Sequence, residues 1–131
     1  MEKLQIHTGQ ICLEIVDDHG ESRGVFKFNP NDVAVAKKVF ELQDTINAKF
    51  DEYEKQYKEA EGDSQKSIEL LDETIDYFRG VIDDIFGAGS SQTLFGDAHT
   101  FSMLEDFFAG ITPYYTKASA ERVQKYKKVK K

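Results

Sequence analysis

The sequence predicts an α+β protein, a mainly α-helical bundle with a small N-terminal antiparallel β-hairpin or sheet. Apolar residues first alternate with polar ones, as in half-buried strands, and then recur every three or four residues, as on one face of a helix. A length of 131 residues suits one domain with one modest core. We therefore predict a single domain over 1–131, divided into a β-hairpin or sheet (1–29), a long helical hairpin (30–86), and a loop with C-terminal helices and a basic tail (87–131).

The strand pattern occupies the first 28 residues. Alternation runs through Leu4–Ile6 and Ile11–Ile15, stops at the Asp- and Gly-containing turn 17–22, and resumes at Val25–Phe28. This pattern predicts two or three antiparallel strands. Because so small a sheet is not stable alone, its apolar face must cover the helices.

The helical pattern begins after Asn29–Asp32, a turn that offers a capping residue. Seven apolar residues then mark one face of a helix that we expect to run to about Glu61, and Gly62–Ser64 separates it from a second helix that ends near Phe86. So short a connection predicts an antiparallel pair. The expected inward faces are Val35, Val39, Leu42, Ile46, Phe50, Tyr53 and Tyr57, then Ile68, Leu71, Ile75, Phe78, Ile82 and Ile85 or Phe86.

The last third of the chain contains more loop. Gly87–Ser91 ends the second helix, and Leu94–Asp97 is expected to be a loop pinned to the core by its two apolar residues. A short helix should start at Thr100 or Ser102 and close at Gly110. Because proline suits a first helical turn, a last helix is expected from Pro113 to about Tyr126.

Charge and composition restrict the class of protein. The formal net charge is −7, yet residues from Lys117 onward carry seven basic side chains against one acidic one, which leaves −13 on the rest. So acidic a body argues against nucleic acid as the main partner, although the basic tail alone could bind it. One cysteine, no signal sequence and no long apolar run predict a protein of a reducing compartment, the cytoplasm, without a membrane partner.

Residues capable of catalysis or metal binding are scattered along the sequence. Two carboxylates four apart on the second helix could share a cation, but a solvated polar face is the simpler interpretation, and no Glu is followed by His three residues later. Asp97–His99 is at most a fragment of a metal or acid-base site, and Cys12 lacks a basic neighbour. We therefore predict no enzyme, no cofactor, and no catalytic or metal-binding residue. The carboxylates in question are Glu69, Asp72, Glu73, Asp76, Asp83 and Asp84.

Aromatic residues are abundant, with 10 Phe and 6 Tyr. A bundle of this size should not enclose all of them, so part of this surface is expected to receive a helix of another protein. The predicted partner-binding residues are Phe95, Phe107, Phe108, Tyr114 and Tyr115, with Lys125, Lys127 and Lys128 as an electrostatic contact.

Three segments, Ile82–Gly89, Leu94–Asp97 and Leu104–Phe108, are followed by a helix rich in Lys and Arg. This arrangement resembles tail assembly chaperones of siphophages and prophages of Gram-positive bacteria. The resemblance implies a protein of the bacterial host cytoplasm that binds the long, apolar, helical tape measure protein. It would keep this client soluble until tail tube subunits polymerise around it, so the tail tube protein is a second expected partner. The resemblance is also compatible with a homo-oligomer.

Two other classes of function remain open at this point. A structural or connector component of a phage particle would form a stable symmetric ring. A small nucleic-acid-binding regulator would use the basic C-terminal tail and show strong dependence on salt.

Overall fold

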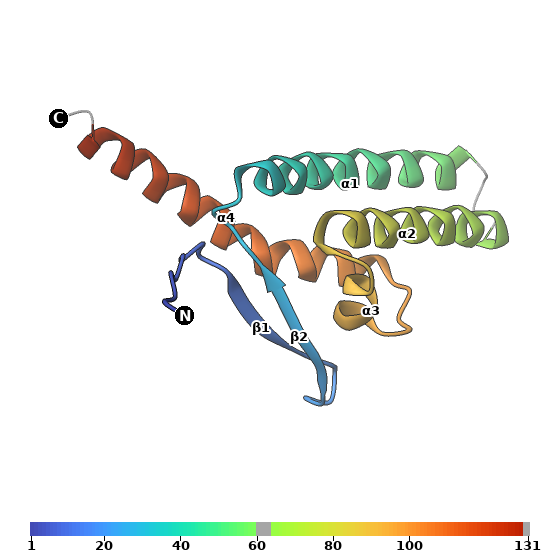
Figure 1. Cartoon of the computed structure of the whole chain (residues 1–131). Helices are drawn as coiled ribbons and strands as arrows, with labels where there is room; N and C mark the ends of the chain where they lie inside the picture. The colour runs from blue at the N-terminus through green and yellow to red at the C-terminus, as the bar shows by residue number, and fades with distance from the viewer. Residues whose placement is uncertain (60–63, 130–131) are drawn as a thin grey trace.

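The computed structural model of the chain describes residues 1–59 and 64–129, with side chains as far as Lys125. Two strands are followed by four helices, so the predicted mainly helical α+β class is confirmed (Figure 1). The elements are β1 (Ile11–Val16), β2 (Ser22–Phe28), α1 (Val33–Glu59), α2 (Ser64–Phe86), α3 (Ser90–Phe95) and α4 (Phe101–Val129).

Helix α4 is the central element of the fold. In Figure 1 it runs diagonally between the α1/α2 pair on one side and the β1/β2 hairpin on the other. Ring contacts confirm both interfaces: Tyr115 lies 6.4 Å from Phe40 of α1 and 6.0 Å from Phe28 of β2, measured between ring centroids. Each hairpin therefore covers its apolar face by packing on α4.

The β-hairpin pairs β1 with β2 in antiparallel register, with Leu13 opposite Phe26. The Asp17 carboxylate closes the turn by accepting hydrogen bonds from the backbone N–H groups of His19 and Glu21, at 2.8 and 3.0 Å. These bonds from Glu21 and His19 hold the pKa of Asp17 below its usual value; desolvation opposes them, and the charge of Arg23 adds a smaller lowering effect.

The third strand that the sequence allowed at Leu4–Ile6 is not present among the described residues. Residues 1–10 form no strand, and the side chains of Leu4 and Ile6 are 86% and 69% exposed. The alternation is present, but the chain turns at Gly9, where φ is +88°, and the amide of Asn29 donates to the Thr8 carbonyl at 2.8 Å. This attachment ends the segment beside the turn that precedes α1.

Only half of each predicted apolar helix face is buried. Along α1 burial stops at Ile46, and Phe50 and Tyr57 are 40% and 45% exposed; on α2, Ile68 is 65% exposed while Ile75 is buried. The reason is tertiary: the core shared with α4 and the β-hairpin includes residues 35–46 of α1 and 71–86 of α2. Beyond it, the start of α4 contributes one ring contact, from Phe101 to Phe50 at 5.0 Å between centroids. The predicted cap of α1 is present, since Asp32 Oδ1 accepts from the Val35 N–H at 3.1 Å.

The C-terminal third is more helical than predicted. The apolar pair Leu94–Phe95 belongs to α3 and not to a loop, although it is pinned to the core as expected. The two helices expected on either side of Gly110 are one continuous helix, α4, with Pro113 inside it. A proline there removes one backbone hydrogen bond, and buried side chains on both sides, Ile111 and Tyr115, offset that cost.

The residues expected to be exposed contacts are mostly core. Phe95, Phe107, Phe108 and Tyr115 are 5%, 7%, 5% and 0% exposed, so the expectation that these contact residues are not wholly buried is wrong for these four. The reason is again the position of α4, which places one of its faces against β2 and another against α1.

Of the described helices, none is both long and apolar enough to span a bilayer.

Tyr115 gives the fold a measurable pH dependence. Burial, with the negative charge of Asp32, raises the pKa of its hydroxyl to about 12 from 10.0. Because the folded pKa is above the unfolded one, the free energy of unfolding is unaffected below about pH 10 and falls as the pH rises toward 12. Urea titrations at about pH 8 and about pH 11 measure this fall, which is on the order of 1–3 kcal/mol in the wild type and should be absent in Tyr115→Phe.

The hydroxyl of Tyr115 has no hydrogen-bond partner among the described residues, so Tyr115→Phe should match or exceed the wild-type stability near pH 8. Tyr77→Phe, at a ring that is 54% exposed, is the matched control and should retain the wild-type pH dependence. Equal pH dependence in the wild type and Tyr115→Phe would contradict the prediction.

Candidate functional site

A cleft of about 480 Å³ lies between the β-hairpin and the first half of α4. Its walls come from elements far apart in the sequence, and it opens to solvent on one side. We call it the hairpin–α4 cleft. Its apolar lining includes Leu13, Ile15, Phe26, Leu94, Phe95, Met103, Phe107 and Ile111.

Charged side chains surround this apolar lining. Asp17, Asp18, Glu14 and Asp106 line the cleft together with a single basic residue, Arg23. Among the described residues the sheet contains only β1 and β2, so the outer edge of β1 is not paired with another strand. Residues of β1 line the cleft. An incoming segment would therefore meet an apolar floor, an acidic rim and an unpaired strand edge.

The predicted contact residues take different places around this cleft. Phe95 and Phe107 form part of its floor, whereas Phe108 and Tyr115 are in the core away from it. Tyr114 is half-buried, with its ring 5.4 Å from that of Phe28.

The basic residues assigned to the same contact lie toward the C-terminal end of α4. Lys125 is exposed there, and the side chains of Lys127 and Lys128 lie outside the described residues. Sequence reasoning missed two further cleft residues, Ile15, which belongs to the alternating strand pattern, and Met103, which no sequence pattern singles out.

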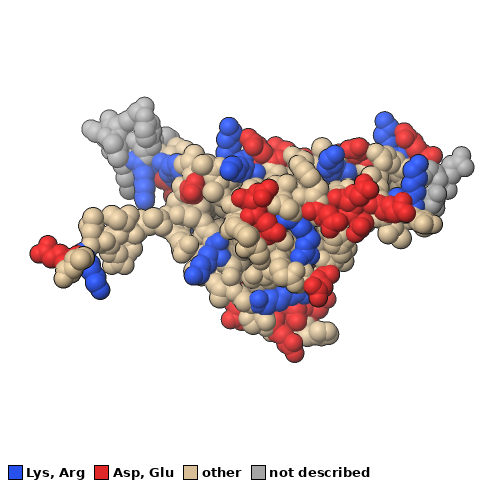
Figure 2. All heavy atoms as spheres, turned by 45° about the vertical axis from the view of Figure 1, so that its right-hand side comes forward, with Lys and Arg blue, Asp and Glu red and all other residues tan. Residues whose placement is uncertain are grey.

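The acidic character of the surface is uneven. On α2, Glu69, Asp72, Glu73, Asp76 and Asp84 are exposed, as their polar positions predicted. Figure 2 shows acidic side chains gathered in a band across the middle of one face, with basic side chains around them. Asp83 differs from the other carboxylates because it accepts from the N–H and hydroxyl of Ser91, at 2.7 and 3.0 Å, and so fixes the start of α3.

Arg79 of α2 ties the connection before α4 to the helical hairpin. Its guanidinium donates to the carbonyl of Ala98 at 2.7 Å and to that of Gly96 at 2.8 Å, and it lies 5.7 Å from the centre of the Phe95 ring. Charged donors of this kind form strong hydrogen bonds. The segment 96–98 is therefore held against α2, and His99 follows it directly.

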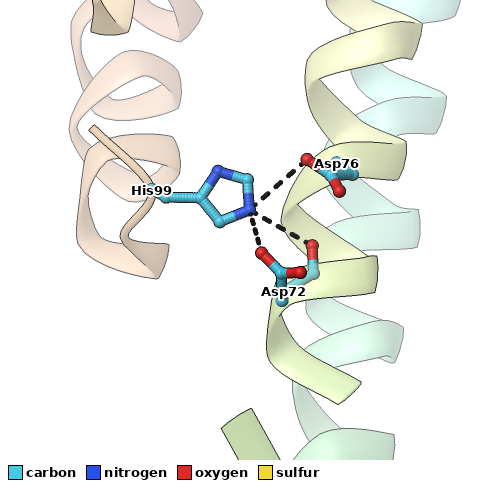
Figure 3. Close-up of side chains that lie close together, drawn as sticks. All are labelled: Asp72, Asp76 and His99. Carbon is cyan, nitrogen blue, oxygen red and sulfur yellow. Dashed lines mark hydrogen bonds and ion pairs between the residues drawn. The ribbon is translucent and has the colours of Figure 1, made fainter. Parts of the chain in front are cut away.

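His99 meets two carboxylates of α2 (Figure 3). Its Nε2 lies 2.8 Å from Asp72 Oδ1, 3.4 Å from Asp76 Oδ1 and 3.3 Å from the Asp72 backbone carbonyl. One ligand atom from each of the three residues lies within 4.8 Å of the others, which makes them a candidate metal site. We call these residues the Asp72–Asp76–His99 cluster.

Both halves of this cluster are visible in the sequence, but nothing there joins them. The carboxylates are expected on a solvated helix face and His99 in a loop, and no spacing rule connects residues 76 and 99. The contact depends on the turn between α3 and α4, which is fixed by Arg79 and has no signature in the sequence.

A family model described as a family of unknown function (DUF6673) matches residues 23–131, well over half of the chain. The chain belongs to the DUF6673 family. A search of curated proteins found no match, and a search of solved structures found none either.

The DUF6673 match begins inside β2 and covers all four helices. It therefore includes the whole Asp72–Asp76–His99 cluster and the α4 wall of the hairpin–α4 cleft, while β1 lies before it. The description of the family names no activity, so the function of this member rests on its own geometry.

The role of Arg79 can be tested by substitution. Arg79→Met keeps an unbranched apolar side chain but leaves the Gly96 and Ala98 carbonyls without their donor, so the free energy of unfolding should fall by about 2–3 kcal/mol. Lys38→Met, at an exposed lysine of α1, is the matched control and should change it by less than about 0.5 kcal/mol. Urea unfolding followed by circular dichroism measures both. A loss no larger than that of Lys38→Met would show that the tether contributes little.

Proposed function

We propose that this DUF6673 protein is a phage tail assembly chaperone, a binding protein and not an enzyme, that keeps the tape measure protein soluble during tail tube assembly. The observation that carries the proposal is the hairpin–α4 cleft, a half-open apolar surface with an acidic rim. An amphipathic helix typically binds such a surface through apolar residues spaced three or four apart. A long, apolar, helical client supplies many segments of that kind.

The size of the cleft fits anchoring residues better than a whole helix. A volume of about 480 Å³ holds roughly two or three large apolar side chains. A client helix would therefore lie across the opening and insert its anchors between β1 and α4. Weak contacts of this type can be released when tail tube subunits, the second proposed partner, compete for the same client surface.

The charge of the protein supports the same role. A formal net charge of −7 keeps a complex with an apolar client soluble through mutual repulsion between complexes. Asp17, Asp18 and Asp106 place part of that charge beside the cleft, where it would favour client segments that carry Lys or Arg next to their apolar anchors. We propose the bacterial host cytoplasm as the place where this binding occurs.

Co-expression with the tape measure protein tests the proposal. The soluble fraction of the client should rise when this chain is present, and the two proteins should co-purify. A client that stays insoluble would contradict the proposal. A stable ring in isolation that is retained in purified particles would then support the connector, and salt-dependent nucleic acid binding lost on removing residues after Arg122 would support the regulator.

The cleft itself is tested by Met103→Glu, which places a carboxylate on its apolar lining. Client co-purification should fall at least about tenfold, while the melting temperature changes little because Met103 is only partly buried. Ile68→Glu is the matched control, since Ile68 is 65% exposed on α2 and lies outside the cleft. Equal loss in both variants, or in neither, would mean that the client binds elsewhere.

A further inference from the structure

We infer that Asp72, Asp76 and His99 bind a divalent transition-metal ion, with Zn²⁺ the best match to the donor set. Two carboxylates and one imidazole meet here from two separate elements of the fold (Figure 3). This site is separate from the hairpin–α4 cleft, none of whose lining residues belongs to it. The inference therefore does not depend on the proposed chaperone function.

Three acceptors converge on one imidazole nitrogen. A single imidazole nitrogen, His99 Nε2, faces three acceptors, which are Asp72 Oδ1, Asp76 Oδ1 and the Asp72 backbone carbonyl. One N–H can make one good hydrogen bond, so the imidazole satisfies one carboxylate and leaves the other to solvent. A divalent cation between the three side chains would be bound by both carboxylates and by the nitrogen lone pair. The two positive charges of the ion would also balance the two negative charges of the carboxylates.

The distances within the Asp72–Asp76–His99 cluster are close to those of a zinc site. Zn²⁺ binds nitrogen and oxygen at about 2.0–2.2 Å, and tetrahedral angles then place neighbouring ligand atoms about 3.3–3.6 Å apart. The separation of His99 Nε2 from Asp76 Oδ1, 3.4 Å, is already in that range, and its separation from Asp72 Oδ1, 2.8 Å, must widen by less than about 1 Å. Both aspartates are well exposed, at 60% and 69%, so their side chains can rotate to allow this change.

The backbone that carries the three ligands is held in place by the fold. Asp72 and Asp76 lie four residues apart on one face of α2, so the helix itself sets their spacing. His99 follows a segment that Arg79 holds by two hydrogen bonds, of 2.7 and 2.8 Å. The fold therefore sets the backbone positions of the three ligands before any ion arrives, and only their side chains have to adjust, which lowers the cost of binding.

The donor set also selects the kind of ion. Imidazole nitrogen suits Zn²⁺ and other first-row transition metals, whereas Mg²⁺ and Ca²⁺ prefer oxygen ligands alone. Three protein ligands leave at least one coordination position for water. A bound ion would connect the turn before α4 to α2 and so stabilise the junction of the two segments.

Isothermal titration calorimetry of the untagged, full-length, metal-free chain with ZnCl₂ tests the inference. We expect binding of one ion per chain, no comparable heat with MgCl₂, and a melting temperature that rises with Zn²⁺ concentration. His99→Gln and Asp76→Asn should each weaken Zn²⁺ binding at least about tenfold. Asp84→Asn, at another exposed carboxylate of α2, is the matched control and should bind as the wild type does.

Other potential zinc ligands in the chain are controlled separately. His7, His19 and Cys12 are exposed near the N-terminus, so a His7→Gln, His19→Gln, Cys12→Ser variant should retain binding. In the wild type, NMR signals of the His99 ring should shift on addition of Zn²⁺. If His99→Gln is unfolded by circular dichroism, Asp76→Asn decides the outcome. Absence of binding in the wild type, or equal binding in the wild type and Asp76→Asn, would overturn the inference.

Discussion

Both hairpins of this protein depend on the burial of one helix, α4. A two-stranded sheet cannot remain folded in water without an apolar partner, and a helical pair buries only the seam between its members. Aromatic rings of α4 supply the partner for both: Phe107 packs on Phe26 of β2 and Phe86 of α2, at 5.8 and 5.9 Å between centroids, and Tyr115 packs on Phe28. Removing α4 would expose the apolar faces of both hairpins at once.

The position of α4 also explains the two candidate sites. The β-hairpin rests on α4 through Phe26 and Phe28, and the space left beside β1 is the hairpin–α4 cleft. The turn that leads into α4 must pass close to α2, where Arg79 holds it, and this path brings His99 to Asp72 and Asp76. The cleft and the cluster therefore both follow from the position of α4. It leaves a gap on the side of the strands and brings about a close contact on the side of α2.

The two sites suit different ligands because their surroundings differ. The cleft has an apolar floor and half-open walls, so the gain on binding there comes from removing apolar surface from water. The cluster is exposed and polar, so binding there depends on direct bonds to an ion and on charge. The far half of the helical hairpin lies largely outside this core: Tyr57 is 45% exposed, and Phe50 is 40% exposed although its ring lies 5.0 Å from that of Phe101 at the start of α4.

The sequence by itself determined the elements that follow from local periodicity and end signals. The strands around the 17–22 turn, the cap at Asp32, and the two long helices with their inward residues Val39 and Phe78 are all properties of neighbouring residues. Only the tertiary structure decided which apolar residues are buried, because that depends on how far α4 reaches. It made Phe108 core and left Ile68 exposed, although both follow the same helical spacing, and it carried the helix through Pro113. It also joined His99 to Asp72, since a contact between segments 27 residues apart is set by packing and leaves no pattern in the chain.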